Sequence, residues 1–217
     1  MSKKTGAEGA LLMQSPVSGD HLRIVAIVQA RETAQKFSPL RRIEGWPLLW
    51  HLYQNLLRSQ LVEQVAIATS THPRDDSISA FGRENGLVVI RGPEDDVLAG
   101  FARAAELLDA DVIVRVLPAE SIVEPGFVDH LIISLLEQDG DFVLLEGGTQ
   151  SQCRGVETFT RRALDRLMMD AHDDDLARRH VTDYLRLHPD FVRIARAPAY
   201  RLQEPESVIS DRPIGSP

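Results

Sequence analysis

The stretch LRIVAIVQAR, residues 22–31, decides the fold. Apart from Arg23, its first seven residues are apolar, and they lack the alternation of a strand with one wet face. Such a run indicates a strand covered on both faces, as in a parallel sheet. The chain turns polar directly afterwards, at Gln29 and Arg31. In open α/β sheets, ligands bind beyond the carboxyl ends of the strands.

The rest of the chain alternates short apolar runs with amphipathic stretches. This order, with short connections, predicts an α/β fold with a mainly parallel, Rossmann-like sheet and helices on both faces. Further strands are expected at 65–68, 87–90, 112–117, 142–145 and 192–195, and helices at 48–57, 76–85, 97–108, 127–136, 161–171 and 174–187.

A length of 217 residues suits one domain with a sizeable core. Residues 1–21 carry no period, and residues 203–217 are polar with three prolines. Both are expected to be flexible tails. The sequence therefore predicts a single nucleotidyltransferase-like domain over residues 22–202.

Composition narrows the class of partner. A formal net charge of −8 disfavours a nucleic-acid binder, although local arginines can still hold a small anion. The single cysteine, Cys153, excludes a disulfide framework and a multi-thiolate zinc site. No apolar run approaches the ~20 residues that cross a bilayer. We expect no membrane partner and a cytoplasmic location.

The loop after the first strand is rich in cations: Arg31, Lys36, Arg41 and Arg42 lie within a dozen residues. Guanidinium groups pair bidentately with phosphate oxygens, so this loop suits a triphosphate. A solvated basic loop is the alternative reading. The chain has neither a G-x-x-x-x-G-K nor a G-x-G-x-x-G motif, which disfavours a Walker P-loop and a nicotinamide dehydrogenase.

The turn after the third strand, residues 91–96 (RGPEDD), combines glycine, proline and acids. Asp95 or Asp96 can cap the following helix. The turn can also line a base or ribose pocket, and both readings remain open.

Short motifs follow one another in a fixed order, each close to an expected element. They are Gln29-Ala30-Arg31, Pro47-Leu48-Leu49, Ala68-Thr69-Ser70-Thr71 with Asp75-Asp76, Arg91-Gly92 with residues 94–98, residues 111–116 (DVIVRV), Glu124-Pro125, and Arg179-His180-Val181-Thr182 with Tyr184. Together they resemble the cytidylyltransferases of the spore-coat-polysaccharide type, relatives of the CMP–sugar-acid synthetases, over about residues 23–195.

The resemblance implies a nucleotide-diphospho-sugar-transferase-like fold and a reaction. A sugar or sugar-acid hydroxyl attacks the α-phosphate of CTP, and pyrophosphate leaves with help from Mg²⁺. It also implies a site, with Arg31 and Lys36 as catalytic cations and CTP or another nucleotide as the ligand. The implied nucleotide-binding residues are Gln29, Ala30, Arg31, Lys36, Thr69, Ser70, Arg91 and Asp95.

The chain departs from the family pattern in two places. The small Gly-Ser-Thr grip of the first loop is missing, and Glu32 adds a negative charge there. Where the family has a metal-binding aspartate after the fourth strand, this chain has Ala119 followed by Glu120. The family's G-L-D-V-E is shortened near Gly155, so Glu120 and Glu157 are the candidate metal ligands.

Three hypotheses follow. The first is an active enzyme that transfers CMP to a sugar or sugar acid in surface polysaccharide biosynthesis. The second is a catalytically degenerate homologue that binds a nucleotide or a partner protein without turnover. The third is a subunit that pairs with an active homologue. Under any of these hypotheses the protein can also form a homodimer.

Overall fold

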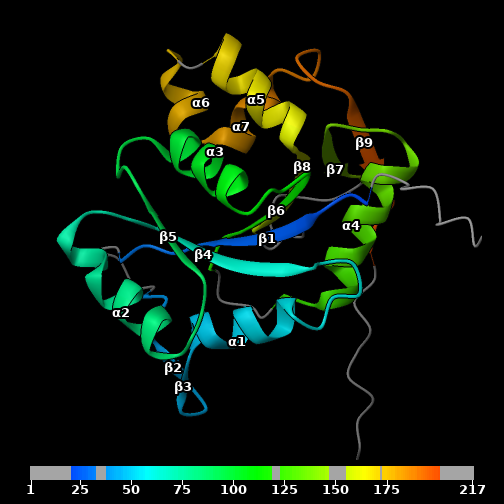
Figure 1. Ribbon diagram of the computed structural model, residues 1–217. Helices are drawn as coiled ribbons and strands as arrows, with labels where there is room; N and C mark the ends of the chain where they lie inside the picture. Colours follow the sequence, from blue (N-terminus) through cyan, green and yellow to red (C-terminus); the bar gives the residue numbers. More distant parts are fainter. Residues whose placement is uncertain (1–20, 33–37, 119–122, 147–154, 172, 201–217) are drawn as a thin grey trace, which may run out of the picture.

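The computed structural model describes residues 21–32, 38–118, 123–146, 155–171 and 173–200. A seven-stranded sheet of order β5-β4-β1-β6-β8-β7-β9 runs through the middle of the molecule (Figure 1). All its strands are parallel except β8, which is antiparallel to β6 and to β7. Its strands are β1 (Ile24–Gln29), β4 (Gln64–Ser70), β5 (Val89–Gly92), β6 (Val112–Val116), β7 (Phe142–Leu145), β8 (Val156–Thr160) and β9 (Ile194–Ala197).

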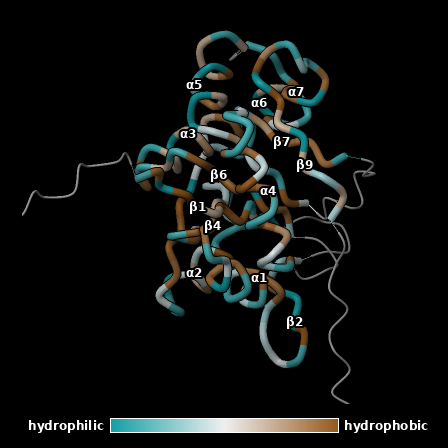
Figure 2. The backbone as a smooth tube through the Cα atoms, turned by 90° about the vertical axis from the view of Figure 1, so that its right-hand side faces the viewer, coloured by the Kyte–Doolittle hydropathy of each residue, from teal (hydrophilic) through white to brown (hydrophobic). Residues whose placement is uncertain are grey.

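Strand β1 is central and buried on both faces, as the apolar run predicted. Val25 and Ile27 belong to one hydrophobic core, whereas Ala26 and Val28 belong to the other. The stretches at the labels β1, β4 and β6 lie in the interior of the tube view (Figure 2). The sheet therefore separates two cores, each covered by helices.

Helices cover both faces, which confirms the predicted fold class. The core on one face includes residues of α1 (Leu48–Leu56), α2 (Asp76–Glu84) and α4 (Pro125–Glu137), and a short 3-10 turn, η1 (Pro73–Asp75), precedes α2. The core on the other face includes residues of α3 (Val97–Leu107), α5 (Arg161–Asp170), α6 (Asp175–Arg179) and α7 (Val181–Leu187).

The structure adds three features that the sequence patterns did not predict. Strand β8 inserts between β6 and β7. A two-stranded hairpin, β2 (Arg42–Ile43) and β3 (Trp46–Pro47), turns through Glu44 and Gly45 at positive φ of 50° and 88°. The helix predicted at 174–187 is broken at His180 into α6 and α7.

Some predictions lie outside the described residues. These include the tails at 1–20 and 203–217 and the positions Lys36, Ala119, Glu120 and Cys153. The single-domain boundaries accordingly stay a prediction. Within the described ranges, no helix has the length and apolar character needed to span a bilayer.

Candidate functional site

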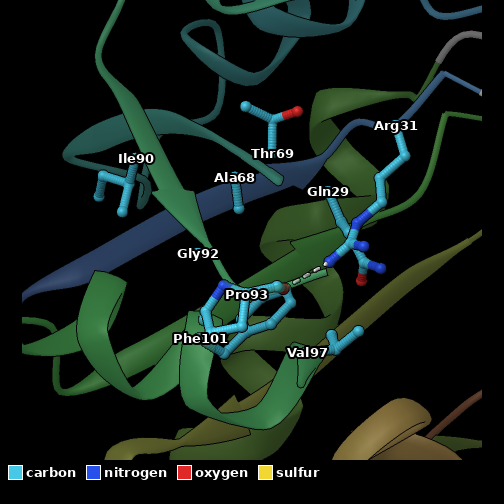
Figure 3. A pocket seen from close by; sticks show the side chains of 10 residues that line it. Gln29, Arg31, Ala68, Thr69, Ile90, Gly92, Pro93, Val97 and Phe101 are labelled. Atoms are coloured by element: carbon cyan, nitrogen blue, oxygen red, sulfur yellow. Dashed lines mark hydrogen bonds between the residues drawn. The ribbon is translucent and has the colours of Figure 1, made fainter. Parts of the chain in front are cut away.

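A hollow lies where the carboxyl ends of β1, β4 and β5 meet the first half of α3 (Figure 3). Its cavity volume is about 20 Å³, and all of its empty space, including the open mouth, amounts to about 280 Å³. Its lining residues are Gln29, Arg31, Ala68, Thr69, Ile90, Gly92, Pro93, Val97, Gly100 and Phe101. The structure thus places a pocket at the sheet edge where the sequence predicted a ligand.

Helix α3 packs closely on β5 beside this hollow because two glycines meet there. A Cβ atom added at Gly92 would lie 2.9 Å from the Cα of Gly100. The start of α3 is fixed by Asp96, which accepts a hydrogen bond of 2.9 Å from the backbone N–H of Ala99. Arg178 of α6 forms an ion pair of 3.1 Å with the same Asp96. Capping by Asp96, one of the two readings of this turn, is confirmed.

Arg31 reaches across the hollow to the turn between β5 and α3 (Figure 3). Its guanidinium donates to the carbonyl oxygens of Glu94, at 2.7 Å, and Pro93, at 3.3 Å. Burial lowers the pKa of Arg31, Arg74 adds to this, and the charges of Asp75 and Asp95 act in the opposite direction. Arginine nonetheless stays protonated in proteins. The hollow therefore carries a fixed positive charge at its mouth.

Asp75 joins the segment after β1 to the end of β4. Its fully buried carboxylate accepts from the backbone N–H of Glu32, at 2.8 Å, and from both the N–H and the hydroxyl of Ser70. Glu32 in turn accepts a hydrogen bond of 2.7 Å from the Ser38 hydroxyl. Glu32, which adds a negative charge to the first loop, is thus hydrogen-bonded to Ser38, the residue that follows segment 33–37.

Several predicted nucleotide-binding side chains do not face the hollow. The Ala30 side chain belongs to the core on the opposite face of the sheet. Thr69 lines the hollow, although its side chain points away from Pro93 and Phe101 (Figure 3). The Ser70 hydroxyl is bonded to Asp75. Arg91 donates to the carbonyl oxygen of Ser70, at 2.8 Å, and pairs with Asp76, at 2.7 Å. Asp95 is exposed in the turn.

A buried polar cluster lies behind Gln29, and the sequence analysis missed most of it. Arg115 of β6, whose side chain is 6% exposed, donates to Gln29 Oε1, at 3.0 Å, and to Glu157 of β8, at 3.2 Å. Thr182 and Arg186 of α7 donate to the same Glu157 carboxylate, at 2.6 and 2.5 Å. Burial lowers the pKa of Arg115, and the charge of Glu157 opposes this.

The sequence did contain a signal for this cluster. Arg115 is the one charged residue in the run VIVRVL, residues 112–117. A charge in a strand buried on both faces needs a partner, because an unpaired buried ion is costly. That argument predicts a buried acid near Arg115, although it does not say which one.

Glu157 as placed does not fit the role of a metal ligand. Both its oxygens accept hydrogen bonds from arginine, and the side chain is only 10% exposed. Within the described part of the chain, no group of three or more His, Cys, Asp or Glu side chains is arranged to hold a metal ion. Glu120, the other candidate ligand, and Lys36, the second catalytic cation, lie outside that part.

Comparison with known proteins assigns this chain to a family. The family model described as Cytidylyltransferase matches residues 25–211. The chain is 28% identical over 193 residues to the spore coat polysaccharide biosynthesis protein SpsF of Bacillus subtilis, covering 82% of this chain and 80% of SpsF. It is 31% identical over 143 residues to a 3-deoxy-manno-octulosonate cytidylyltransferase of Geotalea daltonii, covering 64% of this chain but about half, 53%, of the relative.

Solved structures share the fold. A cytidylyltransferase from Leptospira borgpetersenii superposes with a TM-score of 0.74 at 21% identity, covering 83% of this chain and 78% of the other. This likeness concerns the backbone arrangement. It agrees with a mostly parallel central sheet covered by helices.

Proposed function

Because this chain belongs to the cytidylyltransferase family, we propose that it transfers CMP from CTP to a sugar or a sugar acid in the biosynthesis of a surface polysaccharide. In this reaction a sugar hydroxyl oxygen forms a bond to the α-phosphorus of CTP. The bond from that phosphorus to the bridging oxygen of the β-phosphate breaks, pyrophosphate leaves, and the hydroxyl proton passes to solvent. The names of the SpsF and 3-deoxy-manno-octulosonate relatives support this acceptor class.

One observation carries the proposal: the hollow at the carboxyl edge of β1, β4 and β5 has a charged arginine across its mouth. Arg31 holds two backbone carbonyls there with hydrogen bonds of 2.7 and 3.3 Å. A phosphate oxygen is a stronger acceptor for guanidinium than a neutral carbonyl. We propose that the triphosphate of CTP replaces these two carbonyls as the hydrogen-bond acceptor of Arg31. Gln29 and the backbone of Gly92 and Pro93 then contact the nucleoside.

The remaining parts of the predicted site stay proposals. Lys36 is the second proposed phosphate contact, and Thr69, Ser70, Arg91 and Asp95 are proposed to shape the surrounding loops. Mg²⁺ is the proposed cofactor of the active enzyme. Since Glu157 as placed does not fit a metal, Glu120 is the remaining proposed ligand.

A pyrophosphate-release assay tests this function. The protein is incubated with CTP, Mg²⁺ and a panel of sugar acids and sugars, with the other nucleoside triphosphates as comparison. We expect release that requires both CTP and one class of acceptor and that falls strongly in Arg31→Ala. Arg193→Ala is the matched control, because Arg193 lies at the opposite edge of the sheet, paired with Asp141 at 3.3 Å. Absence of release with every acceptor overturns the proposal of turnover.

One observation favours the second function, a homologue that binds a nucleotide without turnover. The carboxylate expected to hold the metal is bonded to two arginines instead. Under this function CTP raises the melting temperature of the protein, yet no acceptor releases pyrophosphate. Thermal unfolding with CTP, measured beside the release assay, separates the two functions.

A further inference from the structure

Glu157 lies opposite Arg115 on the neighbouring antiparallel strand. Arg115 in turn donates a hydrogen bond to Gln29, which lines the hollow. We infer that Glu157 is a positioning residue, which holds Arg115 and through it the Gln29 amide for the nucleotide, and that it is not a ligand of a divalent cation. This inference rests on the proposed function for the identity of the nucleotide.

Both oxygens of the Glu157 carboxylate are already hydrogen-bonded. Oε2 accepts from Arg115, at 3.2 Å, and from the Thr182 hydroxyl, at 2.6 Å, while Oε1 accepts from Arg186, at 2.5 Å. The side chains of Arg115 and Arg186 are only 6% and 20% exposed. The two guanidinium groups balance Glu157 and the carboxylate of Asp183, which lies 3.9 Å from Arg186. A dication on Glu157 would have to displace its arginine partners and would face repulsion from them at low dielectric, where charges interact more strongly than in water.

Arg115 fixes the direction of the Gln29 amide. Arginine has hydrogen-bond donors and no acceptor. Because Arg115 Nε lies 3.0 Å from the Gln29 side chain, it must face the amide oxygen. The amide nitrogen is thereby directed elsewhere, and within the described residues it donates no hydrogen bond. Since Gln29 lines the hollow, this nitrogen is a donor available to an acceptor atom of the nucleotide.

The cluster joins four elements at one place: β1, β6, β8 and α7. Arg115 and Glu157 are direct cross-strand neighbours on β6 and β8, and α7 supplies Thr182 and Arg186. Arg115 also lies 5.7 Å from the ring centre of Phe101, which lines the hollow. Loss of the Glu157 charge should therefore change the positions of the Gln29 and Phe101 side chains in the hollow.

The chain offers a matched control carboxylate. Asp141 is 8% exposed and lies between two arginines, Arg162 at 2.5 Å and Arg193 at 3.3 Å. It precedes β7 at the amino edge of the sheet, where it also caps the N–H of Arg193. Asp141→Asn removes a buried charge of the same kind without touching the hollow.

The experiment measures CTP affinity by calorimetry in EDTA and in Mn²⁺, for wild type, Glu157→Gln and Asp141→Asn. We expect Glu157→Gln to weaken CTP about tenfold, equally in EDTA and in Mn²⁺, because one misplaced hydrogen-bond donor costs about that factor. Asp141→Asn should bind CTP within about twofold of wild type because distant sites act independently, whatever the variant does to the melting temperature.

Gln29→Ala and the double variant with Glu157→Gln show whether the effect runs through Gln29. A positioning role predicts that the double variant binds CTP no more weakly than Gln29→Ala alone, because the Glu157 effect is already lost. Fully additive losses would overturn the inference. If Glu157→Gln does not fold, Thr182→Val removes one donor to Glu157 and one acceptor of Arg115 at similar volume and enters the same cycle.

A Mn²⁺ titration by electron paramagnetic resonance, without nucleotide, separates this inference from the proposed function. We expect wild type and Glu157→Gln to bind Mn²⁺ alike. Mn²⁺ binding, or a gain in CTP affinity with Mn²⁺, that Glu157→Gln removes would overturn the inference. Wild-type protein that does not bind CTP would instead overturn the proposed function, and the titration would still decide whether Glu157 holds a metal.

Discussion

Two buried carboxylates, Asp141 and Glu157, share the same chemistry at opposite edges of one sheet. Each is at most 10% exposed and each lies between two arginines. They differ in their partners. Glu157 is held by Arg115 and Arg186, which are 6% and 20% exposed, whereas Arg162 and Arg193 around Asp141 are 59% and 50% exposed.

Position on the strands explains what each cluster can do. Strand β8 is antiparallel, so it begins beside the carboxyl ends of β1 and β6 and ends near the amino edge. Glu157 therefore lies beside the ligand edge, and Asp141 contacts Thr160 at the far end of β8. The same ion-pair chemistry supports a binding site at one edge and ties chain segments together at the other.

The largest expected difference concerns stability. Arg115→Ala leaves Glu157 buried with fewer partners, and we expect the free energy of unfolding to fall by about 3–5 kcal/mol. Arg162→Ala removes a mostly exposed partner of Asp141 and should cost only about 1 kcal/mol. Urea denaturation of both variants measures the two losses. Equal losses would show that burial of the arginine does not distinguish the clusters.

Nucleotide affinity should separate the two edges next. Arg31→Ala removes a charge-assisted contact worth about 1.5–3 kcal/mol, so CTP should bind about 10- to 150-fold more weakly. Arg193→Ala at the Asp141 cluster should leave CTP affinity within about twofold of wild type, because distant sites act independently. Calorimetric titration with CTP gives both values. A similar loss in the two variants would point to a general effect of positive charge.

A pair of glycines extends the comparison to close packing. A Cβ at Gly92 would lie 2.9 Å from Gly100 Cα, and a Cβ at Gly140 would lie 2.6 Å from the Cβ of Ala195. Each Gly→Ala variant should lose about 1–3 kcal/mol of unfolding free energy through overpacking. Only Gly92→Ala should also weaken CTP, since it pushes α3 away from β5. Unchanged CTP affinity in Gly92→Ala would argue that the nucleotide does not use this hollow.

The smallest expected effect is in the salt dependence. Raising NaCl from about 0.05 M to about 1 M shortens the screening length to about 3 Å. The coupling energy of Arg162–Asp141, in which the arginine is exposed, is under about 1 kcal/mol and should shrink, whereas that of Arg115–Glu157 should persist. Double-mutant cycles at both salt concentrations measure this. A buried coupling that disappears in salt would contradict the assigned burial.

The sequence predicted the parallel part of the fold well, because double-sided burial leaves an apolar signature. The apolar runs at β1, β4 and β6 have the pattern of strands that are buried on both faces of a sheet. Strand β8, VETFT, has only two apolar residues in five positions and no regular alternation, and no local rule says that it inserts between β6 and β7. The break at His180 was also missed, since apolar spacing continues through it.

For the site, the sequence located the edge correctly but not the side-chain directions. Gln29 and Arg31 line the hollow as predicted. Ser70 and Arg91 lie at strand ends in the same way, yet their side chains bond to Asp75 and Asp76. Which face a residue takes at a strand end depends on the loop beyond it. Arg115 was readable as a buried charge, but its partners come from β8 and α7, which are distant in sequence.

A crystal structure with CTP tests the central claim most directly. We predict the nucleoside in the hollow against α3, hydrogen-bonded to the Gln29 amide nitrogen, with the Arg31 guanidinium moved from the carbonyls of residues 93 and 94 onto phosphate. Density for CTP at any other surface, with Arg31 still on those carbonyls, would contradict the account.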